Sequence, residues 1–168
     1  TPFFEIPVDE NQSKTSRFNS DDKKNFDLSR LALLDDESTK LLIIASRWSQ
    51  RRMEETTSLL EYAALRRIPV LLIEQPPEIF IGNNNASQYL AFLNLETSAD
   101  GVQTVPMGNI EQYEKGRELL DHLERKYENI SVCRLSAELL TGKNQVVVVK
   151  DKKVIYYDDD HLSNEGAA

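Results

Sequence analysis

Short apolar runs and amphipathic stretches alternate along this chain of 168 residues. Residues 40–46 and 69–74 are continuous apolar runs, which are typical of strands buried on both faces. Residues 50–67, between them, carry apolar side chains at helical spacing. A strand, a helix and a strand within about 35 residues predict a right-handed βαβ unit in a parallel sheet.

The second half of the chain predicts three further elements. Residues 109–127 carry a helical apolar stripe that begins at Asn109, a favourable N-cap residue. Residues 130–135 predict a third strand. Residues 146–150 and 154–157 flank Asp151-Lys152 and predict a hairpin in which Tyr156 points inward and Tyr157 outward.

The remaining segments show weaker patterns. We expect residues 1–26 to be irregular apart from a short strand over 3–8, and residues 26–34 to form a short amphipathic helix. Residues 78–108 form a long connection with a short helix over 87–93, and connections of that length are usually functional or mobile. The residues from Leu162 onward predict the start of a helix.

Composition narrows the class of protein. The hydrophobic fraction of 40% and the charged fraction of 29% are those of an ordinary globular domain. A net charge of −8 with scattered basic residues excludes a nucleic-acid binder. No apolar run approaches the roughly 18–20 residues of a membrane-spanning helix. The chain begins at Thr1 without an initiator Met, so we expect a fragment of a larger polypeptide. The chain has one cysteine, Cys133, which we expect to be a buried structural thiol.

Three polar clusters follow predicted strands: residues 46–49, 74–77 and 158–161. Parallel α/β sheets gather ligand-binding groups at the carboxyl ends of their strands, so the three clusters are expected to converge on one edge.

The cluster at 158–161 carries the clearest chemistry. A carboxylate at Asp158, three residues before His161, can accept the imidazole Nδ1–H and leave Nε2 as a general base for a hydroxyl. Asp160 could instead cap the following helix. A solvated acidic turn and a metal site both remain alternatives, although the other histidine, His122, is predicted to lie exposed on the polar side of its helix.

Three sequence blocks resemble one known family. Residues 155–167 (Ile-Tyr-Tyr-Asp-Asp-Asp-His-Leu-Ser-Asn-Glu-Gly-Ala) resemble the C-terminal block of SGNH (GDSL-type) esterase domains. They are most similar to the domains fused behind the membrane part of acyltransferase 3 proteins, the bacterial O-antigen and peptidoglycan O-acetylases. Residues 42–49 resemble that family's strand ending in Ala-x-Arg-Trp, and residues 70–77 resemble its next strand, ending in Gln-x-Pro. The resemblance covers residues 40–168.

The resemblance implies a fold and a set of site residues. The fold would be a three-layer α/β/α sandwich with a mostly parallel sheet, SGNH hydrolase-like, formed by residues 1–168 as a single domain. Asp158 and His161 would be two members of a catalytic triad. From side-chain chemistry rather than from the resemblance, Arg47 would donate to an oxyanion or a substrate carboxylate, and Trp48 would form a wall facing a sugar. The alternative is that Arg47 pairs with a neighbouring carboxylate and Trp48 packs under the following helix.

The family's Gly-Asp-Ser block, which supplies the serine nucleophile, has no counterpart in residues 1–39, and Ser163 is expected to bond locally. Alone, the chain is therefore not expected to hydrolyse esters.

The expected function is that of the periplasmic, extracytoplasmic portion of an inner-membrane O-acyltransferase. Its membrane domain would deliver an acyl group, expected to be acetyl, to a hydroxyl of a cell-envelope glycan such as lipopolysaccharide, without a cofactor or metal. The alternatives are a non-catalytic carbohydrate- or partner-binding module, and a stand-alone esterase whose nucleophile lies outside the chain.

Overall fold

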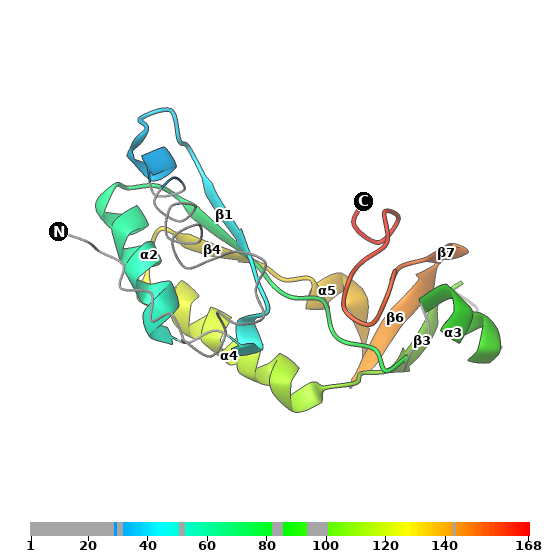
Figure 1. Ribbon diagram of the computed structural model, residues 1–168. Helices are drawn as coiled ribbons and strands as arrows, with labels where there is room; N and C mark the ends of the chain where they lie inside the picture. The colour runs from blue at the N-terminus through cyan, green and yellow to red at the C-terminus, as the bar shows by residue number, and fades with distance from the viewer. Residues whose placement is uncertain (1–28, 30–31, 51–52, 82–85, 94–100, 143) are drawn as a thin grey trace, which may run out of the picture.

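The computed structural model describes residues 29, 32–50, 53–81, 86–93, 101–142 and 144–168. Residues 32–35 are helical, whereas the strand expected over 3–8 and most of the helix expected over 26–34 lie outside the described residues. Figure 1 shows two sheets, one parallel and one antiparallel, with the C-terminal loop folded back beside the second. No helix in the described part of the chain has the length and apolar character needed to span a membrane.

The parallel sheet contains the predicted βαβ unit. Its strand order is β1 (Leu42–Ala45), β2 (Val70–Ile73) and β4 (Ile130–Cys133). Helix α2 (Met53–Leu65) connects β1 to β2, and Arg67, two positions after the helix, has a φ of 56°. Two bonds close that end, from Arg67 N–H to Ala64 O and from Ile68 N–H to Ala63 O, and both are features of a Schellman motif. The α/β class predicted from the sequence is confirmed.

Two helices cover one face of the parallel sheet. Leu60 and Ala63 of α2 and Leu120 and Leu123 of α4 (Ile110–Lys126) pack with Val70, Leu72 and Ile130 in one buried cluster. On the other face, Ile43 is 58% exposed. The prediction that β1 is buried on both faces is therefore wrong, because no layer formed by the described residues packs against its alternate side chains.

Cys133 lies on that same open face. Ala45, Ile73 and Cys133 are register partners across the three strands, and Cys133 is exposed. The expected buried thiol is therefore wrong. In a strand, neighbouring side chains point to opposite faces, so Val132 packs toward the helices and Cys133 points away from them.

The antiparallel sheet is built around β6 (Gln145–Lys150). Strands β3 (Gln103–Pro106) and β5 (Leu140–Thr141) pair with it, and β7 (Lys153–Val154) closes the predicted hairpin. The turn residues Asp151 and Lys152 have φ values of 52° and 64°, as a type I′ turn requires. The helix expected over 87–93 is present as α3 (Ala86–Leu93), whereas β3 and the short helix α5 (Ser136–Leu139) were not predicted.

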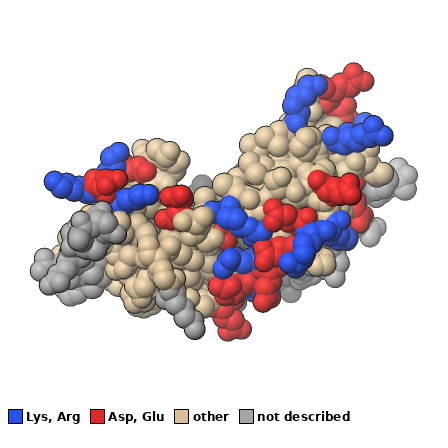
Figure 2. Space-filling view, turned by 180° about the vertical axis from the view of Figure 1, so that it is seen from behind, with Lys and Arg blue, Asp and Glu red and all other residues tan. Residues whose placement is uncertain are grey.

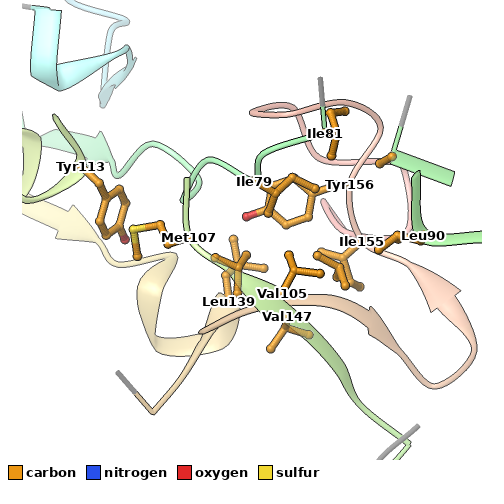
Figure 3. Packing of buried hydrophobic residues seen from close by; sticks show 13 residues of the cluster. Ile79, Ile81, Leu90, Val105, Met107, Tyr113, Leu139, Val147, Ile155 and Tyr156 are labelled. Atoms are coloured by element: carbon orange, nitrogen blue, oxygen red, sulfur yellow. The ribbon is translucent and has the colours of Figure 1, made fainter. Parts of the chain in front are cut away.

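A second buried cluster fills the space between the antiparallel sheet and the chain segments that cross it. Figure 3 shows Val105 of the sheet facing Ile79, Ile155 and Tyr156, whereas Val147 lies on the other side of the strands, because Val105 is the register partner of Val146. Tyr156 is 1% exposed and Tyr157 is 69% exposed, so the predicted inward and outward orientations are confirmed.

Helix α4 joins the two clusters, because Tyr113 belongs to the second and Leu120 to the first. Between them, Gly116 faces the 3-10 helix η1 (Trp48–Gln50). A Cβ at Gly116 would lie 3.1 Å from Ser49 N and 3.2 Å from Trp48 Cβ. The absence of a side chain at Gly116 therefore lets the segment that carries Arg47 and Trp48 lie directly on the helix.

A buried carboxylate also connects these elements. Glu74, at the end of β2, is 1% exposed and accepts the Ser136 N–H at 2.7 Å, which fastens the start of α5. Its other oxygen lies 3.3 Å from Arg117 Nε on α4. The ion pair offsets the cost of burying this charge.

Charge is distributed without a large region of one sign on the face in Figure 2. Basic side chains there stand among acidic ones, and the chain as a whole carries a net charge of −8.

Gly116→Val tests the close contact between α4 and η1. We expect a loss of about 1–3 kcal/mol in the free energy of unfolding, because the added methyl groups must displace the backbone of Trp48 and Ser49. The gain in helix propensity, about 0.5 kcal/mol, is smaller. Urea unfolding measures the difference, with the exposed neighbour Lys115→Val as the control. Equal stability of the two variants would contradict the packing role of Gly116.

Candidate functional site

The candidate site is a tight loop at the C-terminal end of the chain, here called the terminal loop (residues 155–163). Its two arms are joined by the bonds from Tyr157 N–H to His161 O (2.9 Å) and from Ser163 N–H to Ile155 O (2.8 Å). An isolated bridge between Tyr156 and Leu162 continues this pairing. The three consecutive aspartates, 158–160, therefore lie at the tip of the loop.

Asp158 organises the tip of the terminal loop. Its Oδ1 accepts the backbone N–H groups of Asp160 (3.2 Å) and His161 (2.8 Å). Both of its carboxylate oxygens lie 3.0 Å from His161 Nδ1. A carboxylate can only accept, so Nδ1 carries the proton and Nε2 of the neutral ring keeps its lone pair. The contact that the three-residue spacing predicts is present, and the His161 side chain is 70% exposed.

Asp160 has a different role from the one expected. Its Oδ1 lies 3.0 Å from His161 Nδ1, its Oδ2 forms an ion pair with Arg47, and its side chain is only 10% exposed. The final turn at residues 164–166 is held instead by Ser163, whose Oγ accepts the Gly166 N–H at 3.1 Å. The alternative in which Asp160 caps a following helix is therefore wrong.

The terminal loop is attached to the segment that leaves β2. Tyr156 OH donates to Pro77 O at 2.8 Å, and Ile79 N–H donates to Asp159 O at 2.9 Å. Burial raises the pKa of the Tyr156 phenol, so this donor keeps its proton. These bonds bring the end of the antiparallel sheet beside the carboxyl end of the parallel one.

The three polar clusters therefore meet, as the sequence predicts. Arg47 reaches Asp160, and Ser49 N–H lies 3.5 Å from Gln75 Oε1. The third cluster does not reach the site as expected, at the end of a strand of the parallel sheet. The strand before the terminal loop belongs to the antiparallel sheet.

Close packing explains why the C-terminal motif has a glycine at position 166. A Cβ at this position would lie 2.1 Å from Ile155 O, a distance that no side chain can occupy. Glycine therefore lets the last turn pack against the first residue of the terminal loop.

Trp48 lies in the core rather than at the surface of the site. It is 1% exposed, and its Nε1–H donates to Ile73 O at 2.6 Å. This is the packing alternative, and the buried ring offers no face to a sugar. Arg47 also follows its alternative, because its guanidinium is paired with a neighbouring carboxylate, that of Asp160. The Arg47 side chain is 47% exposed, and a guanidinium has five N–H donors, more than one carboxylate can use.

The same cluster has the donor types of a metal site. Asp158, Asp160 and His161 each offer one ligand atom, and these atoms lie within 4.8 Å of one another. Asp160 is already paired with the Arg47 guanidinium, and both carboxylates contact the Nδ1 of His161. A cation would have to displace these partners, so the arrangement fits an oriented imidazole better than a metal centre.

Ser163, the serine nearest to His161 in sequence, is used structurally. Its hydroxyl donates to Val154 O at 2.6 Å, which is the local bonding that the sequence predicts. The described part of the site thus presents an imidazole in contact with a carboxylate, and the Ser163 hydroxyl is bonded away from both.

Comparisons with known proteins place the chain in a family. A search of the curated proteins found no match, and a search of the solved structures found none. The model of the family described as "SGNH domain (fused to AT3 domains)" matches residues 3–168. This match begins well upstream of residue 40, where the resemblance in the sequence motifs starts. The chain belongs to the SGNH domains that are fused to AT3 domains.

Proposed function

We propose that this chain is the SGNH portion of a bacterial O-acyltransferase, which passes an acyl group, specifically acetyl, to a hydroxyl of a cell-envelope polysaccharide such as lipopolysaccharide. The observation that carries the proposal is the contact of the Asp158 carboxylate with His161 Nδ1 at 3.0 Å. Membership of a family fused to AT3 domains supports a membrane acyltransferase domain as the source of the acyl group. The domain would work in the periplasm, attached to an inner-membrane protein.

The proposed chemistry has two acyl transfers. A serine hydroxyl attacks the carbonyl carbon of the acyl donor, and its proton passes to His161 Nε2 as the new C–O bond forms. The imidazolium then gives this proton to the leaving group. In the second transfer the acceptor hydroxyl attacks the acyl-serine, gives its proton to Nε2, and the serine oxygen recovers a proton as it leaves.

Asp158 and Arg47 have separate roles in this scheme. Asp158 orients the imidazole and stabilises its charged form. Arg47 is held at the terminal loop by Asp160 and would direct a remaining N–H toward the oxyanion that develops on the acyl group.

The proposal assigns the serine to a segment outside the 168 residues, because the tripeptide Gly-Asp-Ser occurs nowhere in them. The same observation favours one other function, a non-catalytic module that binds a carbohydrate or a partner. The two functions differ in one measurable respect, since only the first needs Nε2 of His161 as a base.

His161→Ala in the full-length protein tests the base. We expect p-nitrophenyl acetate turnover to fall by about 10²–10⁴-fold, because the serine then has no group to take its proton. His122→Ala is the matched control, since His122 is the other histidine of the chain and is exposed on α4. Equal turnover by the two variants would rule out the catalytic assignment and leave the binding module.

Asp158→Asn tests the orienting carboxylate. An amide at this position can donate to Nδ1, which favours the tautomer with the proton on Nε2 and removes the base. We expect kcat for p-nitrophenyl acetate to fall by about 10²–10⁴-fold, by analogy with the same change in a serine protease triad. Asp151→Asn, in the exposed hairpin turn, serves as the control for the loss of one charge. A change in KM alone would show that Asp158 does not act on the imidazole.

A further inference from the structure

A groove of about 660 Å³ lies directly beside the terminal loop. Its walls are residues 78–81, which leave β2, and residues 106–109, which lead into α4, with Tyr89 and Asp159 completing the lining. The bonds from Gly108 N–H to Glu78 O (2.8 Å) and from Ile79 N–H to Asp159 O (2.9 Å) tie these walls together. The groove therefore shares a residue with the loop that carries Asp158 and His161.

Phe80 is the most exposed aromatic side chain of the groove. It is 77% exposed, whereas its neighbours Ile79 and Ile81 are 1% and 4% exposed. The segment is extended and Ile79 bridges to Met107, so alternate side chains point into the core and Phe80 points out. The side chain contributes little to the core, and its exposed ring is available to a ligand.

The charged groups that line the groove are acidic. Its two ionisable residues other than tyrosine, Glu78 and Asp159, are both acids, and none of the residues lining it is Lys or Arg. Asn109 is exposed there, and its side chain makes no capping bond to α4. Carboxylates and an amide accept bonds from hydroxyl and amino groups, and the acids repel a carboxylate or phosphate.

An exposed aromatic ring flanked by hydrogen-bond acceptors fits one class of ligand. The C–H face of a sugar ring packs on the negative face of an aromatic ring, while its hydroxyls donate to acceptors at the edge. We infer that this groove binds the acceptor polysaccharide, with a sugar ring on Phe80, and that it selects neutral or amino sugars over anionic ones. The inference deepens the proposed function and rests on it for the identity of the polymer.

Affinity electrophoresis of the chain tests the inference without any need for catalysis. The probe is the neutral fraction of the host bacterium's envelope polysaccharide, de-acylated with base and cast into the gel. We expect the polymer to retard the wild-type chain, and Phe80→Ala to weaken binding about tenfold through the loss of ring stacking. Phe80→Trp should keep the retardation. Leu65→Ala, 78% exposed on α2, is the control for removal of an exposed apolar side chain.

A second binding experiment tests the preference of the groove for uncharged sugars. Partial succinylation of the same polysaccharide adds carboxylates, and we expect it to weaken binding by the wild-type chain. The double variant Glu78→Gln, Asp159→Asn should recover part of that loss, because it removes the two acids of the groove. Equal binding of the neutral and succinylated polymers would overturn the preference.

The outcomes separate the inference from the proposed function. No retardation of the wild-type chain, or equal retardation of wild type and Phe80→Ala, overturns the groove as the polysaccharide site, even if His161→Ala abolishes ester turnover. Loss of retardation in Phe80→Ala together with full turnover by His161→Ala supports the groove and overturns the catalytic role. Loss of polysaccharide acylation in cells by Phe80→Ala, with unchanged retardation, would assign Phe80 to a contact with another protein segment and overturn the inference.

Discussion

The arrangement of the site depends on the bonds that join the terminal loop to the segment leaving β2. Tyr156 OH donates to Pro77 O, and Ile79 N–H donates to Asp159 O. The terminal loop follows an antiparallel sheet that is not hydrogen-bonded to the parallel one, so its position beside the carboxyl end of β2 must come from such contacts. Both donors are buried, and a buried donor left without an acceptor costs about 1–3 kcal/mol. These bonds therefore hold the loop where Arg47 pairs with Asp160.

Sequence patterns predicted the elements whose signals are local and strong. The βαβ unit, the helix that begins after Asn109 and the hairpin around Asp151 all follow from periodicity and turn chemistry. Strand β3 was missed because Gln103–Pro106 is short and contains one buried apolar side chain, Val105. The open face of β1 was also missed, because an apolar run shows that side chains could be buried and not whether a layer lies against them.

In the candidate site, too, local contacts could be predicted from the sequence and long-range contacts could not. The contact of Asp158 with His161 could be predicted because His161 follows Asp158 by three positions, within a single turn. The pairing of Arg47 with Asp160 could not, because 113 positions separate the two residues and only the folded chain brings them together. For Trp48 the residue type left both a sugar-facing and a packed position open, and the exposure of Phe80 had no signal in the sequence. Gly116 allows Trp48 to pack against α4 and be buried. Phe80 is exposed because alternate side chains of its extended segment, beside β3, point away from the core.

The charged groups around His161 suit the proton transfer that we propose for it. Asp158 and Asp160 both lie at 3.0 Å from Nδ1, and Arg47 neutralises one of these two charges. Before a proton arrives at Nε2 the group carries one net negative charge, and after it arrives the group is neutral. Two carboxylates without the guanidinium would repel each other at this distance, and the guanidinium without Asp160 would oppose a cationic imidazole. In the proposed reaction, Asp160 would keep the Arg47 guanidinium paired while it stands near His161, so that one site would hold both a proton acceptor and an oxyanion donor.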